Sequence, residues 1–317
     1  MIFKNLVLID GINRSGKNSI VDTITSFKRS ESIEMNYIFE HIIEGVSLNL
    51  VSKRFAKSFF EKFLNEIAYN KLLGRNVNHR KKDKSSIHNF SFPLIYKKRL
   101  LEDDNPKKIF NKMQKSKNFF PFMTHEILPN IFVLDNLNIK FKMIAMFRNP
   151  FDLIYSWKKK EIIKKFGRRN FTLSFNTQKR VYPWYVYHSS KKWLRLRTAD
   201  KIASIILDLI NNSIKNYKNS KNKKNIYLIK YEDYICNPEN KLRQISKFLN
   251  TNFSNQTKNK IKKLKLPVHT KDIEKKRKIS LNFCKKSLSP KFYDKIEKLE
   301  KSYKNSFYGL KKKNEIL

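Results

Sequence analysis

The sequence predicts an α/β fold, with a parallel sheet of about five strands flanked by helices and with helical insertions. Three apolar runs without polar alternation are typical of buried parallel strands: Leu6–Asp10, Phe141–Phe147 and Ile226–Tyr231. Weaker candidates for strands are Asn36–Phe39 and Phe119–Thr124. Amphipathic segments alternate with these runs, and this alternation favours a parallel sheet that is covered on both faces.

Segments with apolar residues at helical spacing separate the expected strands. The strongest is Asp200–Tyr217, whose isoleucines and leucines recur every three or four residues. Further helices are expected at Ser19–Phe27, Val51–Leu73, Asp152–Phe166, Asn240–Leu249 and Lys291–Tyr303. Polar, lysine-rich stretches predict surface loops at Arg75–Ser86, Arg168–Arg180 and Asn216–Asn225. We therefore expect one domain over residues 1–310 and a frayed basic tail over residues 311–317.

The composition combines a sizeable apolar fraction with a very high positive charge. The chain has 317 residues, of which 40% are hydrophobic, so it can bury a substantial core. Its formal net charge is +42, but the abundance of Lys, Asn and Ile is also what AT-rich codons produce. No zinc-finger, helix-turn-helix or RNP pattern is present, so nucleic acid is not expected as the main partner. Small anions, or peripheral contact with an anionic surface, remain open.

Cysteine usage and hydropathy predict the compartment. Cys236 and Cys284 are far apart and have no metal-binding spacing, so we expect neither a disulfide framework nor a metal site. No apolar run reaches the roughly 18 residues that a transmembrane helix needs. The N-terminal run lacks a cleavage site, so it is not interpreted as a signal peptide. A cytoplasmic location is the resulting prediction.

The first expected strand runs directly into a glycine-bounded loop and then a helix. Gly11 and Gly16 permit backbone angles that turn loop amides toward an anion, and the helix N-terminus adds positive potential. The spacing Gly-x4-Gly-Lys matches a P-loop. Asn18 stands where a nucleotide triphosphatase has the Ser or Thr that binds Mg²⁺. The candidate phosphate- or sulfate-binding residues are Asn13, Arg14, Ser15, Gly16, Lys17, Asn18 and Ser19.

A second candidate anion site follows the strand Phe141–Phe147. Arg148 lies at the carboxyl end of this strand, where open α/β sheets bind ligands. Asn149 can cap the next helix, and Pro150 suits its first position. Ser156 follows Arg148 by two helical turns, and an arginine with a hydroxyl can clamp a phosphate. Taken alone, this segment is more simply explained as a capped strand-to-helix turn.

Together, the two loops resemble those of the sulfotransferases that use 3′-phosphoadenosine 5′-phosphosulfate (PAPS). The first loop reads Asn13-Arg14-Ser15-Gly16, and the second reads RNPFDLIYS from Arg148 to Ser156. A third segment, which starts at Tyr231 and contains YEDY, NP and FL, is similar to another stretch of that family. The resemblance extends from about residue 5 to about residue 250. It implies a P-loop-like fold and PAPS as co-substrate without a metal, with the 5′-phosphosulfate at the first loop and the 3′-phosphate on Arg148 and Ser156.

The same resemblance suggests catalytic residues. The stretch Met123-Thr124-His125 is similar to a Lys-Thr-His motif whose histidine is the base, which implies that His125 deprotonates the acceptor hydroxyl. Arg14 occupies the place of a lysine that contacts the leaving phosphate; an arginine supplies the charge but is a much weaker acid. Met123 replaces the lysine of the motif, and Lys17 is a candidate substitute.

A second candidate base lies earlier in the chain. Related carbohydrate sulfotransferases use a glutamate in the region of Glu40, which lies beside His41. The choice between His125 and Glu40 stays open, and so does a packing role for His125. Imidazole is well matched to proton transfer near neutral pH.

The implied acceptor is a hydroxyl group of a carbohydrate, a glycolipid or a small molecule. Aromatic and amide side chains suit sugars, and they occur in two stretches, residues 76–80 and 182–187. Both stretches could equally be ordinary surface or core segments. The run Lys275–Lys278 lies where the family has a late basic segment, but it lacks the glycine-rich signature and is better explained as a solvated charge run. The candidate acceptor contacts are Asn76, Asn78, His79, Arg80, Tyr182, Trp184 and Tyr187.

Two other functions remain as alternatives. A P-loop kinase of a nucleoside or metabolite, using ATP and Mg²⁺, agrees with the first loop, and Ile131–Asp135 would then be a strand ending in a magnesium-binding Asp. Asn18 and the RNPFDLIYS segment oppose the kinase. A non-catalytic basic protein that binds nucleic acid or a membrane surface is supported by charge alone.

Overall fold

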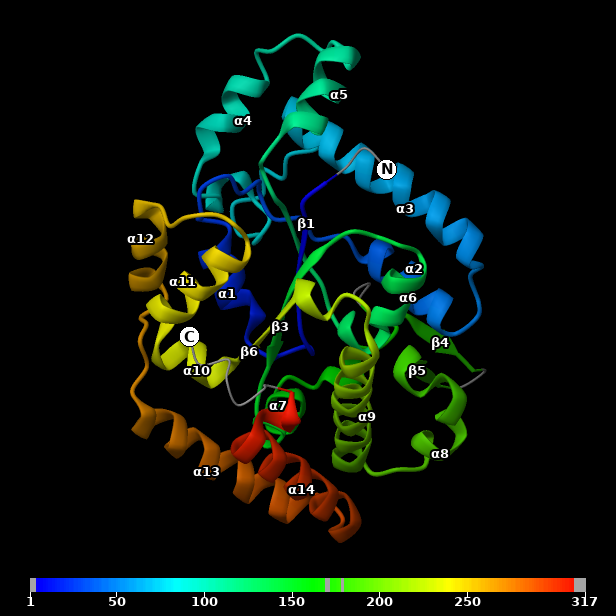
Figure 1. Ribbon diagram of the computed structural model, residues 1–317. Coiled ribbons are helices and arrows are strands. Elements are labelled where there is room, and N and C mark those ends of the chain that lie inside the picture. Colours follow the sequence, from blue (N-terminus) through cyan, green and yellow to red (C-terminus); the bar gives the residue numbers. More distant parts are fainter. Residues whose placement is uncertain (1–3, 169–171, 178–179, 311–317) are drawn as a thin grey trace.

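A four-stranded parallel sheet with the strand order β2-β1-β3-β6 forms the centre of the protein (Figure 1). The computed structural model describes residues 4–168, 172–177 and 180–310. The strands of the sheet are β1 (Leu6–Asp10), β2 (Phe120–Met123), β3 (Lys142–Phe147) and β6 (Ile226–Lys230). A separate antiparallel pair consists of β4 (Ser174–Asn176) and β5 (Val181–Pro183). The predicted α/β class with a helix-flanked parallel sheet is confirmed.

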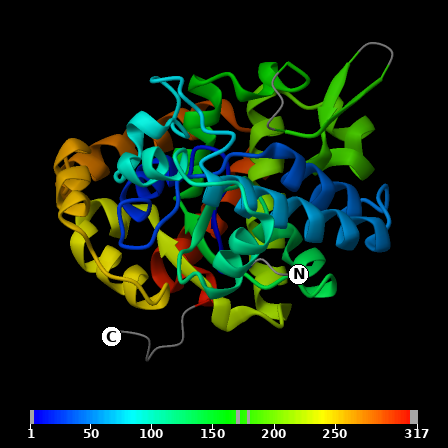
Figure 2. The same cartoon turned by 90° about the horizontal axis from the view of Figure 1, so that it is seen from above.

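Helices cover both faces of the sheet. In Figure 1, α1, α10, α11 and α12 lie on one side of it, and α2, α3, α6 and α9 lie on the other. Figure 2 shows α12 and the β4–β5 pair on opposite sides of the molecule. The helices are α1 (Lys17–Ile24), α2 (Tyr37–Ser47), α3 (Lys53–Leu73), α4 (Pro93–Arg99), α5 (Pro106–Lys115), α6 (Ile131–Asn136), α7 (Pro150–Lys159), α8 (Ser190–Leu194), α9 (Thr198–Asn219), α10 (Tyr231–Cys236), α11 (Pro238–Phe248), α12 (Asn255–Lys263), α13 (Thr270–Ser287) and α14 (Pro290–Ser306).

The continuous apolar character of β1 follows from burial on both faces. Successive side chains of a strand point to opposite faces of the sheet. Val7 and Ile9 accordingly join the apolar cluster with α1 and α11, whereas Leu6 and Leu8 join the larger cluster with α2, α3 and α9. All five residues of the strand are buried, so its carboxyl end is held rigidly against both helical layers.

The predicted strand at Asn36–Phe39 is wrong, because this segment begins helix α2. The Asn36 side chain caps the helix by accepting a hydrogen bond from the Ile38 amide at 3.1 Å. A cap and a buried helical face outweigh the strand preference of the aromatic and branched residues here. The outer edge of β2 is instead bordered by residues 30–34 through two isolated parallel bridges, so the sheet has four strands rather than about five.

Other boundaries differ by up to about two helical turns. Helix α7 ends at Lys159 rather than near residue 166, and α9 continues to Asn219, into the predicted loop 216–225. The predicted loop 168–180 contains strand β4 and in part lies outside the described residues. The predicted tail 311–317 also lies outside them, and the single domain over residues 1–310 stays a prediction.

The run Lys275–Lys278 was predicted to be solvated. Its three lysines are indeed exposed on α13, but the prediction is wrong for Arg277. The Arg277 guanidinium donates to Asp152 at 3.0 and 3.1 Å and to Glu232 at 3.1 Å, and it lies 3.5 Å from Glu300. Its side chain is only 15% exposed. The guanidinium therefore ties α13 to α7, α10 and α14, the helices that carry the second anion-binding segment and its neighbours.

Replacement of this guanidinium tests its structural role. We expect Arg277→Met to lower the free energy of unfolding by about 3 kcal/mol, because three carboxylates lose their shared partner. Urea unfolding monitored by circular dichroism measures the loss. The exposed neighbour provides the control Lys276→Met, which should change stability by less than about 0.5 kcal/mol. Equal losses in both variants would contradict this role.

Candidate active site

The parallel sheet brings four chain segments to one edge. Residues 11–16 follow β1, residues 124–128 follow β2, residues 148–149 follow β3, and residue 231 follows β6. Because all four strands run parallel, their carboxyl ends meet at this edge. The two candidate anion-binding segments, the candidate base and the YED stretch are therefore neighbours.

The first loop has the tight geometry that its glycines predict. Gly11 and Gly16 have positive φ angles of 155° and 98°. A side chain at Gly16 would lie 2.2 Å from the Tyr231 ring, so glycine is required for the close approach. The loop leads into the N-terminus of α1, which has no side-chain cap. The Ser15 hydroxyl at this turn is buried and has no hydrogen-bond partner in the described part of the chain.

Lys17 points beneath the loop rather than out of it. Its ammonium group is buried and donates to the Gly11 carbonyl at 2.5 Å. Burial lowers the pKa of Lys17, and nearby carboxylates, chiefly Glu126, oppose that shift. Asn18 is exposed, and Ser19 donates its hydroxyl to the Gly16 carbonyl at 2.8 Å. Of Lys17, Asn18 and Ser19, it is therefore Lys17 that stabilises the loop, through the Gly11 carbonyl.

Arg14, Arg148 and Ser156 converge above the first loop. The Arg14 Nε donates to the Ser156 hydroxyl at 3.1 Å, and Arg148 donates to the Arg14 carbonyl at 2.9 Å. The Arg148 guanidinium also lies over the Tyr231 ring, 4.9 Å from its centroid. The two segments that the sequence predicts as anion sites thus form a single cluster.

This cluster has an excess of donors. The Arg148 Nε is buried and has no hydrogen-bond partner among the described residues. Burial and the charge of Arg148 lower the pKa of Arg14, which shows that the two guanidinium groups repel each other. Neither forms an ion pair with a carboxylate in residues 4–168, 172–177 and 180–310. An anion between them would relieve the repulsion and supply the missing acceptor.

The two candidate bases form one contacting pair. Glu40, in the first turn of α2, accepts a hydrogen bond from the His125 backbone amide at 3.0 Å, and its carboxylate lies 3.4 Å from the His125 Nδ1. Burial, followed by the charge of Lys17, lowers the pKa of His125 well below its usual range. Burial, with Glu44 and Glu126, raises the pKa of Glu40. The imidazole is therefore neutral near pH 7 and has a free lone pair, and the same burial makes it a weaker base than an exposed histidine.

Glu126 links the two neighbouring loops. Its carboxylate accepts a hydrogen bond from the Asn13 amide at 2.6 Å and another from the Tyr185 hydroxyl at 3.1 Å. On the other side of the loop, the Trp157 indole donates to the Asn13 carbonyl at 2.7 Å. Burial raises the pKa of Glu126 to about 7. The position of Asn13 in the first loop is thus set by groups from two other segments.

A polar cavity of about 290 Å³ lies between the N-terminus of α2, helix α3 and the loop at residues 75–87. It reaches Asn36, immediately before Tyr37, whose ring centroid is 6.1 Å from that of His125. Asn76 and Asn78, two of the predicted acceptor contacts, line this cavity, whereas His79 and Arg80 are not among its lining residues. Its other polar lining residues include Ser32, Glu34, Glu66, Asn70, Lys71 and Arg75.

The predicted aromatic acceptor contacts lie on and after β5. The Tyr187 ring packs on Phe175 at 4.7 Å, and Trp184 packs on Tyr185 at the same centroid distance. Tyr182 also lies on Phe175. Within this segment it is Tyr185, which the sequence reasoning passed over, whose hydroxyl reaches Glu126.

Sequence reasoning missed several residues that shape this edge. Glu126 directly follows the candidate base, and Tyr231 and Tyr185 lie inside motifs that were singled out for other residues. The sequence did offer a signal for them, namely a carboxylate next to the candidate base and tyrosine hydroxyls within the motifs. Their partners, however, are at least 59 residues away in sequence, and only the fold identifies them.

The magnesium site of the kinase alternative is wrong. Residues 131–135 lie in helix α6, not in a strand. The Asp135 carboxylate accepts hydrogen bonds from the Lys221 amide and the Asn222 side chain, at 3.2 and 2.6 Å. Asp135 therefore anchors the turn that follows α9.

Comparisons with known proteins assign the chain to a family. A family model described as a sulfotransferase domain matches residues 19–307, starting just after the first loop. No curated protein sequence matches the chain. Among solved structures, the chain is similar to a sulfotransferase domain of the Synechococcus olefin synthase, at 12% identity and a TM-score of 0.43, covering 80% of this chain and 76% of the other.

Two further structures are similar at the same low level. A sulfotransferase from Alicyclobacillus acidocaldarius is 13% identical, with a TM-score of 0.40 and coverage of 79% and 82% of the two chains. The mouse sulfotransferase SULT7A1, in complex with PAP, is 11% identical, with a TM-score of 0.37 and coverage of 96% and 86%. The family assignment rests on the family model and not on these structures.

The raised pKa of Glu126 predicts a pH-dependent stability. An acid whose pKa rises on folding, here from 4.5 to about 7, stabilises the folded state fully below the unfolded value and loses that contribution as pH rises through 7. We therefore expect Glu126→Gln to gain up to about 3 kcal/mol relative to the wild type between about pH 5 and about pH 8. Urea unfolding at both values measures this difference. The control is Glu274→Gln at an exposed site; a constant difference for Glu126→Gln would contradict the account.

Proposed function

We propose an acceptor class and a base for this chain, which belongs to the sulfotransferase domain family and is a PAPS-dependent sulfotransferase. The acceptor is a hydroxyl group, most simply that of a carbohydrate or glycolipid. His125 is the general base. The observation that carries the assignment is the contact between His125 and Glu40 beside the first loop. The family membership removes the kinase alternative, which also lacks its magnesium-binding Asp.

The donor site in this proposal lies between the first loop and α7. The loop amides, the Ser15 hydroxyl and the start of α1 would receive the 5′-phosphosulfate. Arg148 and Ser156 would hold the 3′-phosphate. The partnerless Arg148 Nε supports this role, and so does the absence of a carboxylate partner for Arg14 and Arg148 among the described residues.

The proposed reaction is a direct transfer. With the Nδ1 proton directed at Glu40, the lone pair of the imidazole lies on Nε2 and takes the proton of the acceptor hydroxyl. The acceptor oxygen forms a bond to sulfur while the bond between sulfur and the phosphate oxygen breaks. The leaving group is 3′-phosphoadenosine 5′-phosphate (PAP), whose new charge Arg14 stabilises. Glu40 is a positioning residue, since it is fully buried and acts through His125.

The amide-lined cavity supports a carbohydrate acceptor. Sugars present several hydroxyl groups, which asparagine side chains can bind both as donors and as acceptors. Asn36, Asn70, Asn76 and Asn78 line the cavity, and Phe63 gives it an apolar wall. Asn36 also caps α2, and the Asn78 side chain is bonded to Asp83, Ser85 and the Arg80 amide. Its volume of about 290 Å³ suits one sugar unit rather than a larger aromatic acceptor.

A cytoplasmic location remains a prediction. Cys236 and Cys284 are both free, as expected in a reducing compartment. Within the described ranges, no helix has the length and the apolar character needed to cross a bilayer.

Loss of the second anion clamp should weaken donor binding. We expect Arg148→Ala to raise the Kd for PAP by about 10- to 100-fold, because a charge-assisted hydrogen-bonding group is removed. Isothermal titration calorimetry without metal measures the affinity. The matched control is Arg195→Ala, an exposed arginine after α8. Unchanged PAP affinity in Arg148→Ala would refute the assignment of the 3′-phosphate.

The roles of the two candidate bases are separable by kinetics. We expect His125→Gln to lower kcat by at least about 100-fold with little change in PAP affinity, because proton transfer is lost. Glu40→Gln should lower kcat less and should shift the pH profile of kcat, because the His125 Nδ1 then loses its carboxylate partner. Rates of PAP formation with PAPS and a sugar acceptor, measured across pH, test both. A larger loss in Glu40→Gln than in His125→Gln would make Glu40 the base.

A further inference from the structure

Helices α4 and α5 form a hairpin with an unusually apolar surface. In Figure 1 the two helices lie together at one end of the molecule, beyond the sheet. Leu94 is 65% exposed, and Leu100 and Leu101, at the turn between the helices, are 63% and 88% exposed. Ile95 and Phe110 are also exposed. Such a concentration of exposed apolar side chains in one hairpin is typical of an interaction surface.

The same hairpin is strongly basic. Residues 93–117 contain eight basic and three acidic residues. Two of the acidic residues are engaged, because Glu102 pairs with Lys112 and Asp104 pairs with Arg75. Lys108 and Lys115 form no ion pair with any described residue. The acidic run Glu102–Asp104 directly follows the exposed Leu100 and Leu101, and the uncompensated positive charge lies beside it, on Lys108 and Lys115 of α5.

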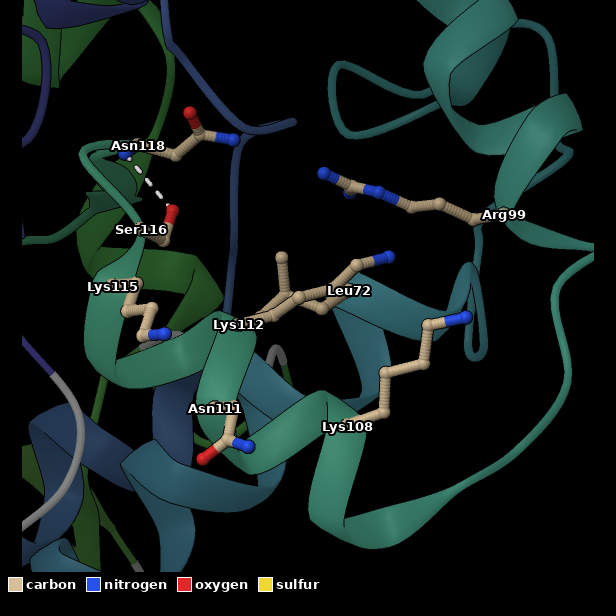
Figure 3. Close-up of a pocket in the computed structure, with 8 residues that line it drawn as sticks. All are labelled: Leu72, Arg99, Lys108, Asn111, Lys112, Lys115, Ser116 and Asn118. Atoms are coloured by element: carbon tan, nitrogen blue, oxygen red, sulfur yellow. Dashed lines mark hydrogen bonds between the residues drawn. The ribbon is translucent and has the colours of Figure 1, made fainter.

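A cavity of about 530 Å³ lies between the arms of the hairpin. Figure 3 shows Arg99 of α4 facing Lys108 and Lys112 of α5 across this hollow, with Leu72 between them. Lys108, Lys112 and Lys115 follow one another at intervals of four and three residues, which places them on one face of α5. Since Arg99 is paired with Glu31 and Lys112 with Glu102, Lys108 and Lys115 supply the free charge of the cavity.

This cavity is remote from the donor site. Ser116 and Asn118 line it and precede β2, whose first residue, Phe120, pairs with Leu6 at the start of β1. The hairpin therefore lies near the amino ends of the strands, opposite the edge that carries the first loop. A partner bound here leaves the donor site open.

We propose that the α4–α5 hairpin docks on an anionic lipid bilayer. The exposed leucines at the turn enter the interface between headgroups and acyl chains, and the lysines of the cavity bind lipid phosphate. A soluble polyanion such as RNA satisfies only the lysines and leaves the leucines in water. A bilayer with acidic lipids satisfies both, so the combination of apolar tip and basic cavity favours the membrane.

Vesicle flotation with the full chain tests this docking. The probes are vesicles of phosphatidylcholine alone and vesicles in which about one-third of the lipid is phosphatidylserine. We expect the wild type to float with the acidic vesicles only, and to be released by high salt. Flotation that is equal with both vesicle types, or absent with both, would overturn the proposal. Release of the protein from acidic vesicles by RNA but not by free phosphate at equal ionic strength would show that the surface prefers a polyanion, and would also overturn it.

Matched variants locate the surface. The double change Leu100→Ser with Leu101→Ser, and separately Lys108→Gln with Lys115→Gln, should each lower the partition coefficient by about tenfold. The controls are Leu50→Ser, at an exposed leucine outside the hairpin, and Lys275→Gln with Lys278→Gln on α13. Equal losses in the controls would mean that overall charge alone binds the vesicles, and the docking surface would be wrong.

The inference does not depend on the proposed acceptor. PAP affinity, measured with the same variants, should stay unchanged, because no hairpin residue lies in the donor cluster. A failure of vesicle binding with normal PAP binding would refute the docking alone. Normal docking without transfer to sugars would refute only the proposed acceptor.

Discussion

The buried ammonium group of Lys17 is the charge on which the active-site edge depends. Three carboxylates, those of Asp10, Glu40 and Glu126, raise the pKa of this lysine against the effect of burial. An isolated buried charge would be very costly, but here opposite charges and a hydrogen bond to the Gly11 carbonyl compensate it. The lysine thereby holds the first loop from below, through the Gly11 carbonyl.

The same buried network fixes the loop after β2. The Asp10 carboxylate accepts hydrogen bonds from the Thr124 hydroxyl and from the amides of Ile127 and Leu128. Glu126, between these residues, reaches back to the Asn13 amide. The candidate base His125 is therefore held at a set distance from the first loop by bonds on both sides of it.

In this arrangement the positively charged side chains lie on two sides of the first loop and have different roles. Lys17 lies below the loop and adds to the effect of burial in lowering the pKa of His125, whereas Arg14 and Arg148 lie above the loop. In an ordinary P-loop the lysine contacts phosphate directly. Here the guanidinium pair offers that positive charge, and its neighbour Tyr231 stacks on Arg148.

Much of the fold could be predicted because its signals are local. Apolar runs identify the central strands, and an Asn-Pro pair after a strand identifies the start of α7, where Asn149 accepts a hydrogen bond from the Phe151 amide. Helical spacing allowed Arg148 and Ser156 to face the same side, but it was the family resemblance that favoured an anion site there. The segment from Asn36 to Phe39 was wrongly predicted as a strand, because over so few residues a helix cap and a strand preference are hard to distinguish.

The remaining features are not local and could not be read from spacing. Arg277 belongs to an exposed lysine run in the sequence, yet its partners come from residues as far away as Asp152. Glu126 and Tyr185 meet across 59 residues. Such pairs depend on how the helices pack around the sheet, which composition and periodicity do not specify.

The most direct test of the central claim is the thermal shift of the wild-type protein with PAP in the presence of a metal chelator. The two-part donor cluster predicts a clear rise in melting temperature with PAP, a smaller one with the 2′-phosphate isomer, and the smallest with ADP, which lacks the second phosphate. A rise only with ATP and Mg²⁺ in a parallel measurement without the chelator, or equal rises with PAP, its 2′-phosphate isomer and ADP, would contradict a donor site built from the first loop, Arg148 and Ser156.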